Sequence, residues 1–247
     1  MSKGPSTLRL DRLLSNLGYG SRREVERMVW ADLVTLDGVV LEDADQRIAV
    51  TPDLSVRMSV NGAPLDPPPG FALMLHKPAG VTCSHKEQGP LVYSLLPERW
   101  RRREPAISTV GRLDKETSGL LLLTDDGALL HRIISPRNHV TKRYDVILDR
   151  PLRGDEKKIF ASGELMLENE DKPLLPVELE ALSPTRAHVT LTEGRYHQVR
   201  RMFAAVGNHV TALHRDRIGN LALPEDLQAG SYRILGPPDL ALVLPPR

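Results

Sequence analysis

The chain has 247 residues, and its 33 Lys and Arg residues nearly balance 32 Asp and Glu residues, which gives a formal net charge of +1. A single cysteine, Cys83, excludes an internal disulfide, and the sequence lacks the Cys and His spacing of a structural zinc site. No apolar run reaches membrane-spanning length, and no charged start precedes a long apolar segment. These features predict a cytoplasmic protein without a membrane anchor or structural metal.

The N-terminal part of the chain shows two helical patterns followed by a hairpin pattern. Leucines recur at helical spacing until Gly18 breaks the period: Leu10, Leu13, Leu14 and Leu17. Ser21 and Glu24 have the spacing of a capping box, which predicts the start of a second helix. Residues 34–41 then predict two short strands joined by a turn at Asp37 and Gly38.

Clustered arginines distinguish this N-terminal part from the rest of the chain. They are Arg9, Arg12, Arg22, Arg23 and Arg27. A basic face on a small helical unit is most often only solvated. Local clusters of basic charge are also what phosphate binding requires, whatever the net charge of the whole chain. The arginines alone leave both interpretations open.

A proline-rich stretch predicts the domain boundary. Residues 61–70 contain three consecutive prolines, and no apolar period continues through them. We therefore expect an N-terminal domain over residues 1–60, a linker over 61–70 and a second domain over 71–247. Strands and helices alternate in the second domain, beginning with a strand over residues 71–75, and there is no Gly-x-Gly-x-x-Gly motif. This pattern favours an α+β fold with a mixed, mainly antiparallel sheet.

Residues 111–121 hold the most informative pattern in the sequence. Arg112 and Asp114 are two positions apart, so an extended backbone directs both side chains to one face. Glycines on either side permit tight backbone paths, and the apolar residues 120–123 predict a buried strand. An isolated Asp between glycines is most often a turn residue, so this pattern alone does not identify a nucleophile.

Paired acids at Asp125 and Asp126 look at first like a magnesium or acid–base site. A short helix with an apolar face follows them over residues 128–134. Acids in the first turn of a helix complement its dipole and its free N–H groups. We therefore interpret both acids as the beginning of this helix.

Two later segments carry further polar and aromatic side chains. Residues 142–146 alternate in polarity, which predicts a strand with Tyr144 on the same face as a valine. Residues 187–191 predict another strand, and the helix that follows has apolar residues at i, i+3, i+4 and i+7: Val199, Met202, Phe203 and Val206. Arg200 and Arg201 fall in its first turns, where the simplest interpretation is a solvated basic face.

The order of these segments resembles the pseudouridine synthases, in the ribosomal branch that carries an RNA-binding S4 domain before the catalytic domain. The likeness extends over nearly the whole chain. It is carried by residues 111–114, 142–146 and 193–210, with further likeness at 124–127 and 131–137. The resemblance implies an S4-like N-terminal domain and a catalytic domain whose cleft crosses the face of its sheet.

The resemblance also implies a role for the candidate catalytic residues. Asp114 stands at the family's catalytic Asp, a nucleophile that works without metal or cofactor. Tyr144 matches the tyrosine that stacks on the target base. Arg200 matches the basic residue that pairs with the Asp and favours its ionised form. Arg112 matches the arginine that fills the space left by the flipped nucleotide.

Other residues near the expected cleft have less defined roles. Val199 matches the apolar residue that lines the family's pocket, although an ordinary core position fits the sequence equally well. We expect Arg201 to contact the substrate, since it follows Arg200 in the same helix. For His197 and His214 we expect hydrogen bonding or RNA contact, and not metal ligation.

The expected partner is ribosomal RNA, held through phosphate contacts by the five N-terminal arginines. Residues 193–210 favour a uridine of 16S rRNA, in free RNA or in a partly assembled small subunit, modified by a monomeric enzyme. A sister enzyme that acts on 23S rRNA and a non-catalytic S4-type RNA-binding or assembly factor are the alternatives. The presence of Asp114, Tyr144 and Arg200 together argues against the non-catalytic factor.

Overall fold

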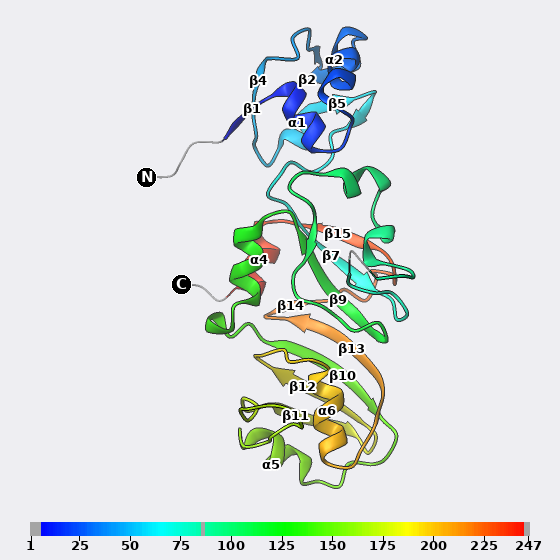
Figure 1. Cartoon of the computed structure of the whole chain (residues 1–247), viewed down its shortest axis with the longest axis vertical. Coiled ribbons are helices and arrows are strands. Elements are labelled where there is room, and N and C mark those ends of the chain that lie inside the picture. The colour runs from blue at the N-terminus through cyan, green and yellow to red at the C-terminus, as the bar shows by residue number, and fades with distance from the viewer. Residues whose placement is uncertain (1–5, 85–86, 245–247) are drawn as a thin grey trace. The chain divides into compact units, whose positions relative to one another are not determined.

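The structure is a computed structural model that describes residues 6–84 and 87–244 (Figure 1). The chain divides into two compact units. The first comprises the residues up to Ala72, together with Leu96–Ser108 and Thr124–Gly127. The second comprises Leu73–Leu95, Thr109–Leu123 and the chain from Ala128 onward.

The first unit contains the predicted helices and hairpin. Its elements include β1 (Thr7–Arg9), α1 (Leu10–Asn16), α2 (Arg22–Trp30), β2 (Val34–Leu36), β3 (Val39–Val40), β4 (Arg47–Ala49), α3 (Leu54–Arg57), β5 (Met58–Val60) and β6 (Ala63–Pro64). Strands β3, β2, β5 and β6 form an antiparallel sheet in that order, and β1 pairs with β4. The predicted capping box is confirmed, because the Ser21 hydroxyl accepts the Glu24 N–H and the Glu24 carboxylate accepts the Ser21 N–H.

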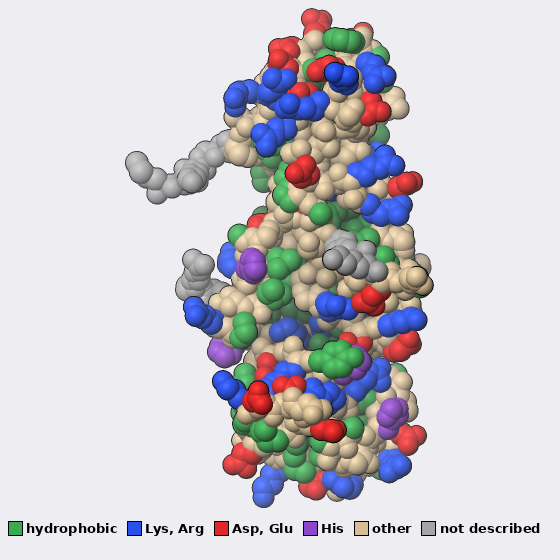
Figure 2. Space-filling view, in the orientation of Figure 1, with side chains coloured by type: hydrophobic (Ala, Val, Ile, Leu, Met, Phe, Trp, Pro, Cys, Tyr) green, Lys and Arg blue, Asp and Glu red, His purple; other side chains and the backbone are tan. Residues whose placement is uncertain are grey.

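Helix α1 supplies the centre of the first unit's core. Its leucines are fully buried together with Val25 and Val29 of α2 and Val34 of β2. The polar face of the unit stays outside, and Figure 2 shows Lys and Arg side chains gathered over its surface with acids between them. The apolar period therefore determined the buried face, as the sequence predicted.

The first residues of the predicted linker, 61–65, belong to the N-terminal sheet and core. Asn61 and Gly62 both adopt left-handed backbone conformations, with φ of 52° and 74°, and they turn the chain from β5 into β6. Leu65 is buried in the N-terminal core. Asn-Gly is a strong hairpin signal, which the neighbouring prolines obscured. Residues 61–65 thus complete the first unit, while the outer domain limits stay a prediction.

The interpretation of Asp125 as a helix-starting residue is wrong. Its side chain is 1% exposed and accepts hydrogen bonds from the Gly70 N–H at 2.8 Å and from the Arg103 guanidinium at 3.0 Å. Arg103 also lies over the Phe71 ring, with its Cζ 4.7 Å from the ring centroid. Asp125 therefore joins three separate segments of the first unit instead of serving the helix that follows it.

The second unit is built on a mixed sheet, as predicted. The strand order is β11-β12-β10-β13-β9-β7-β15, and β8 pairs with β9 and β14 with β13. Strands β9 and β13 are parallel, whereas β10 is antiparallel to both β12 and β13. The bounds are β7 (Ala72–Lys77), β8 (Ser108–Thr109), β9 (Thr117–Thr124), β10 (Lys142–Leu148), β11 (Glu178–Ser183), β12 (Arg186–Leu191), β13 (Val210–Ile218), β14 (Leu221–Ala222) and β15 (Tyr232–Leu235).

Helices pack on this sheet and position the loop before α6. The helices are α4 (Gly127–Ile134), α5 (Glu156–Ala161), α6 (Gln198–Ala205) and α7 (Pro237–Val243), and short 3₁₀ helices span Val92–Leu95 and Pro136–Asn138. A further 3₁₀ helix, Glu98–Arg102, belongs to the first unit. Figure 1 shows α5 and α6 beside β10, β11 and β12. Phe160 of α5 meets Phe203 of α6 edge to face at 5.2 Å, and both rings are buried in the same core as Val146 and Val189.

Gly119 allows β9 and β13 to approach closely. Its φ is +111°, and a Cβ built on it would lie 2.2 Å from the carbonyl oxygen of Arg215. Any larger residue would force the two strands apart. The glycine thus places β13 directly beside the chain that leads out of the Asp114 loop.

Candidate active site

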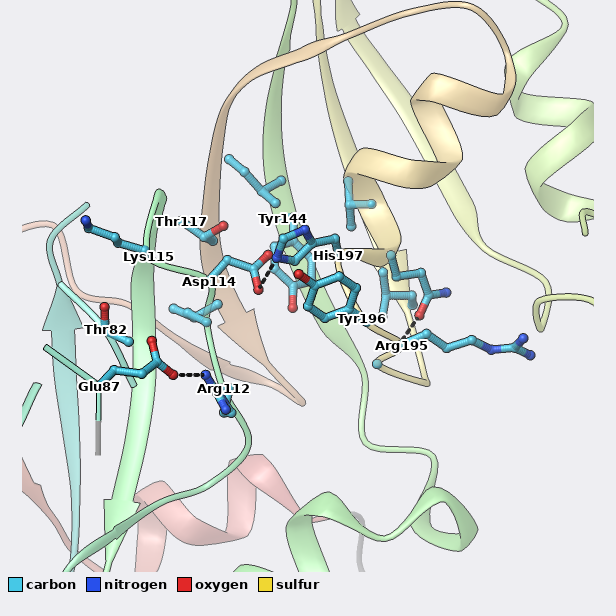
Figure 3. Close-up of a pocket in the computed structure, with 16 residues that line it drawn as sticks. Thr82, Glu87, Arg112, Asp114, Lys115, Thr117, Tyr144, Arg195, Tyr196 and His197 are labelled. Atoms are coloured by element: carbon cyan, nitrogen blue, oxygen red, sulfur yellow. Dashed lines mark hydrogen bonds and ion pairs between the residues drawn. The ribbon is translucent and has the colours of Figure 1, made fainter. Parts of the chain in front are cut away.

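Asp114 lies in the loop between β8 and β9, at the wall of a cavity of about 640 Å³ (Figure 3). That volume is in the range of small-ligand pockets. Its side chain is 36% exposed, so the carboxylate is accessible from the cavity. The lining also includes Arg112, Tyr144 and Val199. The structure therefore brings together four residues that the sequence marked as candidates.

The buried side chain of Lys77 stabilises the backbone of the Asp114 loop. Its ammonium is completely buried and donates to the carbonyl oxygens of Pro78, Lys115 and Thr117 at 2.9, 3.2 and 2.7 Å. Burial lowers the pKa of Lys77. Because two of the three acceptors follow Asp114 closely in the chain, the buried ammonium fixes the backbone that carries the carboxylate.

The residue that contacts Asp114 is His197. Its Nε2 lies 3.4 Å from Asp114 Oδ1, and its backbone is left-handed, with φ of 47°. This conformation turns the chain just before α6 and aims the imidazole back at the cavity (Figure 3). The Tyr196 ring stacks on the imidazole, with centroids 3.9 Å apart and planes inclined by 15°. An aromatic pair thus forms the wall opposite the Asp114 loop.

Arg200 is placed differently from the predicted pairing. Its guanidinium donates to the Val210 carbonyl at 2.8 Å, and among the described residues it makes no hydrogen bond or ion pair with Asp114. Arg200 therefore ties α6 to the start of β13. The expected Arg200–Asp114 ion pair is not present in the structure.

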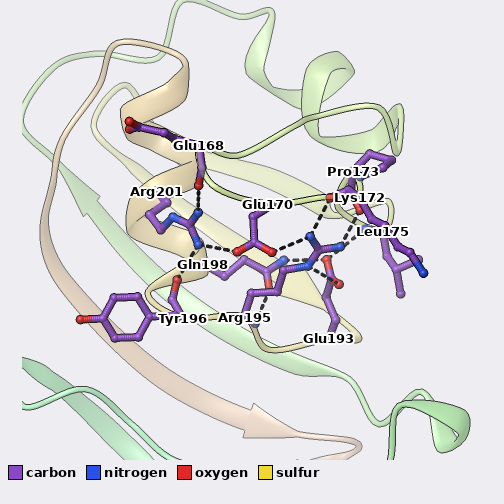
Figure 4. Close-up of polar contacts among 10 residues, drawn as sticks. All are labelled: Glu168, Glu170, Lys172, Pro173, Leu175, Glu193, Arg195, Tyr196, Gln198 and Arg201. Atoms are coloured by element: carbon purple, nitrogen blue, oxygen red, sulfur yellow. Dashed lines mark hydrogen bonds and ion pairs between the residues drawn. The ribbon is translucent and has the colours of Figure 1, made fainter.

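Arg201 is also engaged elsewhere. Its guanidinium pairs with Glu170 at 2.7 Å and donates to the carbonyls of Tyr196 and Glu168 (Figure 4). These contacts hold Arg201 within the chain, and its expected contact with substrate stays a prediction. Arg201 stabilises the backbone of the loop that carries Tyr196 and His197.

Tyr144 reaches the cavity from β10 and meets Arg215 of β13. Arg215 is 3% exposed and donates from Nη1 to the Tyr144 hydroxyl at 3.4 Å and from Nε to the Leu120 carbonyl at 2.8 Å. The guanidinium carbon lies 5.9 Å from the Tyr144 ring centroid. A buried cation beside a phenol orients the hydroxyl and favours its hydrogen-bond acceptor role.

Arg112 stands at the exposed rim of the cavity and pairs with Glu87 at 3.2 Å. Both side chains are more than half exposed, so the pair is weak and easily exchanged for another anion. His214, in contrast, lies away from the cavity lining. Its Nδ1 is 2.8 Å from the Ser118 hydroxyl, and burial, with a smaller contribution from His76, lowers its pKa.

The N-terminal arginines differ in availability. Arg9 is engaged by Asp11 and Asp45, and the exposed Arg22 lies 3.3 Å from Asp11. Arg12 and Arg22 line a second cavity of about 590 Å³ within the first unit, together with Ser15, Asn16, Glu104 and Pro105. Arg23 and Arg27 are exposed on α2. The first unit thus presents cations on α1 and α2 around a concave surface.

Sequence reasoning missed the supporting residues. Lys77 and Arg215 were not singled out, and no periodicity marks a buried cation within a strand. Tyr196 was not singled out, although an aromatic residue beside His197 in a loop of otherwise polar residues was the available signal. Within the described residues, no group of His, Cys, Asp and Glu side chains is arranged to hold a metal ion, and no described helix is long and apolar enough to cross a membrane.

Comparisons with known proteins show which families the chain is similar to. Residues 72–205 match the family described as RNA pseudouridylate synthase, and residues 8–51 match the S4 domain. The chain is 43% identical to ribosomal small subunit pseudouridine synthase A of Yersinia pestis, over 96% of this chain and 98% of that protein. It is 40% identical to the protein of the same name from Escherichia coli strain K12, over 96% and 100% of the two chains. A solved structure described as a pseudouridylate synthase has a TM-score of 0.67 and 33% identity, and covers 96% of this chain and 100% of its own.

Proposed function

The chain belongs to the RNA pseudouridylate synthase family, and we propose that it converts a specific uridine of 16S ribosomal RNA to pseudouridine. The observation that carries the proposal is the convergence of Asp114, Tyr144 and Arg112 on one cavity. Relatives of 40% and 43% identity are named as small-subunit enzymes, which favours 16S over 23S rRNA. We also propose that the enzyme acts as a monomer, in the cytoplasm where ribosomes are assembled.

The chemistry that this site must support is an isomerisation. The bond between ribose C1′ and uracil N1 breaks, and a bond between C1′ and C5 forms. C5 loses a proton and N1 gains one, so nothing is oxidised, reduced or hydrolysed overall. In the proposal, the Asp114 carboxylate is the nucleophile, and the Tyr144 ring packs on the uracil while its hydroxyl assists proton transfer.

The target base must leave its stack before it can reach Asp114. We propose that Arg112 enters the vacated space, since it stands at the rim with only an exposed partner, Glu87. Exchange of that partner for an RNA phosphate or base requires little rearrangement. The cavity volume then accommodates the flipped uridine against Val199, which is 4% exposed and lines the pocket.

An ionised Asp114 must also remain ionised when the base covers it. Desolvation disfavours the charged form, whereas a hydrogen bond to the charged form favours it. Arg200 donates to the Val210 carbonyl and does not contact Asp114, so it is not placed to stabilise the charged carboxylate. The Nε2 of His197 lies 3.4 Å from Asp114 Oδ1, and we propose that the protonated imidazole stabilises the carboxylate.

The activity is tested by mapping pseudouridine after incubating the purified protein with 16S transcript, 23S transcript and small-subunit particles. We expect modification of a specific uridine in 16S rRNA, and loss of that modification in cells that lack the protein. Modification of 23S rRNA alone would identify the sister activity. RNA binding without any modification would favour the non-catalytic S4-type factor.

The N-terminal unit is proposed to hold rRNA through phosphates. Phosphate contacts release counterions, so the slope of log affinity against log salt reports their number. We expect the double variant Arg12→Ala/Arg22→Ala to bind 16S rRNA more weakly and to lower that slope by roughly 1.5, for two lost contacts. The measurement is a salt titration of RNA binding by filter retention or anisotropy.

Arg57→Ala is the matched control for this pair. Arg57 is a partly exposed arginine of the same unit that pairs with Asp37 at 2.6 Å, outside the second cavity. Its loss should leave the slope unchanged. Equal slopes for wild type and the double variant would leave a protein-contact or structural role as the better explanation of the N-terminal unit.

A further inference from the structure

Tyr196 is exposed at the edge of a site made for RNA. Its side chain is 75% exposed, the same fraction as Trp30 in the other unit, and no described hydrophobic residue of the second unit is as exposed. It lines the cavity with Asp114. A large aromatic ring in water at a binding cavity is a candidate contact surface and not a packing residue.

The ring has one covered face and one open face. His197 covers the first at a centroid distance of 3.9 Å and an interplanar angle of 15°. Among the described residues, no other ring or cation stacks on Tyr196. The imidazole in turn contacts Asp114. The Tyr196 and His197 rings therefore lie between the open face and the reacting carboxylate. A planar group that packs on it continues a stack that ends at the catalytic residue.

Hydrogen bonds and ion pairs hold the backbone that carries the Tyr196 ring. Arg201 donates to the Tyr196 carbonyl at 3.2 Å, and Glu170 bridges Arg201 at 2.7 Å and Arg195 at 3.1 Å (Figure 4). Arg195 also donates to the carbonyl of Lys172 at 2.7 Å. Together these contacts fix the backbone of Tyr196 without covering its ring. A ring ordered in advance loses little freedom when a ligand stacks on it.

We propose that Tyr196 stacks on an RNA nucleobase next to the flipped target uridine. The proposal rests on the proposed function, since it assumes an RNA strand in the cavity. Base flipping draws the strand into the cavity, so that a neighbouring base can reach the wall opposite the Asp114 loop, away from the vacated space that Arg112 fills. Aromatic side chains commonly stack on such a base, because every base has a π face. Tyr144 contacts the target base itself, whereas Tyr196 holds its neighbour and so positions the strand.

The test separates binding from chemistry with three variants. Tyr196→Ala removes the ring, and Tyr196→Phe keeps the ring and removes the hydroxyl. Met166→Ala is the control, because Met166 is 49% exposed in the same unit and lies outside the cavity lining. For Tyr196→Ala we expect KM for 16S rRNA to rise about tenfold, with a single-turnover rate at saturating enzyme close to wild type. Tyr196→Phe should restore the wild-type KM, and Met166→Ala should not change it.

A spectroscopic readout distinguishes stacking from a general loss of structure. A short 16S fragment carries 2-aminopurine beside the mapped uridine, and its fluorescence is followed as enzyme is added. Wild type and Tyr196→Phe should quench the fluorophore on binding, and Tyr196→Ala should not. An unchanged KM and full quenching with Tyr196→Ala would overturn the proposal, as would a loss confined to the single-turnover rate. If wild type modifies 23S rRNA instead, the proposed 16S function fails, and the same quenching measured beside the mapped 23S uridine still decides whether Tyr196 stacks on a base.

Discussion

Replacing Asp114 by asparagine should lower pseudouridine formation by at least about 10³-fold while the fold and the affinity for rRNA are retained. The amide has nearly the size of the carboxylate but supplies no anionic nucleophile. No other described carboxylate lines the cavity apart from Glu87, which is engaged by Arg112. A substitute nucleophile is therefore not at hand.

The structure explains why this change should spare the fold. The Asp114 side chain is 36% exposed, and its contact with His197 is the side-chain interaction that the described residues show for it. The hydrogen bond that shapes the loop is made by the Asp114 carbonyl, which accepts the Thr117 N–H at 3.0 Å. That backbone bond survives the substitution.

Glu116→Gln is the matched control for Asp114→Asn. Glu116 is an exposed acid on the same loop, and it does not line the cavity. Both variants lose one negative charge, so a purely electrostatic effect on RNA binding would appear in both. Modification of 16S transcript and RNA affinity are measured separately for each. Substantial turnover by Asp114→Asn would remove Asp114 from the role of nucleophile.

Local sequence patterns predicted the backbone segments that line part of the cavity, and the family resemblance implied the roles of their side chains. Arg112 and Asp114 are two positions apart, which places them on one face of an extended backbone. Alternating polarity in residues 142–146 predicts the strand that carries Tyr144. The structure confirms that strand as part of β10. A pattern of this kind describes which way a backbone faces, but it did not distinguish Asp114 from an ordinary turn residue, and the family resemblance was needed for that.

The roles of Arg200 and Arg201 could not be read from helical spacing, and the Arg200–Asp114 pairing was implied by the family resemblance. Helical spacing correctly predicts that Val199, Met202 and Phe203 are buried, but it does not say where a flexible guanidinium ends. Two of the partners of Arg201, Glu168 and Glu170, lie more than 30 positions away in a segment without a periodic pattern. Partners of this kind are set by the tertiary fold.

Asp125 shows the same limit for acids. Its position before a helix suggested a dipole interaction, which is a local rule. The structure instead gives it Gly70 and Arg103, which lie 55 and 22 positions away. Burial decides between the two interpretations, because a carboxylate that is 1% exposed requires a partner that is equally buried. Arg103 is also 1% exposed.

Asp125→Ala should therefore destabilise the protein by about 3–5 kcal/mol, because removal of one partner leaves a buried charge uncompensated. Arg103 is poorly placed to find another acceptor. Its Nε and Nη1 are buried without hydrogen-bond partners among the described residues, and its remaining bond is to the Pro67 carbonyl at 2.8 Å. The Gly70 N–H would lose its acceptor as well. The measurement is equilibrium unfolding in urea, with RNA modification assayed well below the transition.

Two further variants make this expectation specific to the buried pair. Glu98→Ala removes an acid of the same unit whose ion pairs with Arg101 and Arg102 are exposed, and it should change the free energy of unfolding by no more than about 0.5 kcal/mol. The double variant Arg103→Leu/Asp125→Leu removes both charges, so it should be more stable than Asp125→Ala. A loss below about 1 kcal/mol for Asp125→Ala, or a double variant less stable than the single one, would mean that the pair is not what holds these segments together. Rescue by the double variant would instead show that the acid is needed because the arginine is there, a dependence between distant positions that no local sequence pattern records.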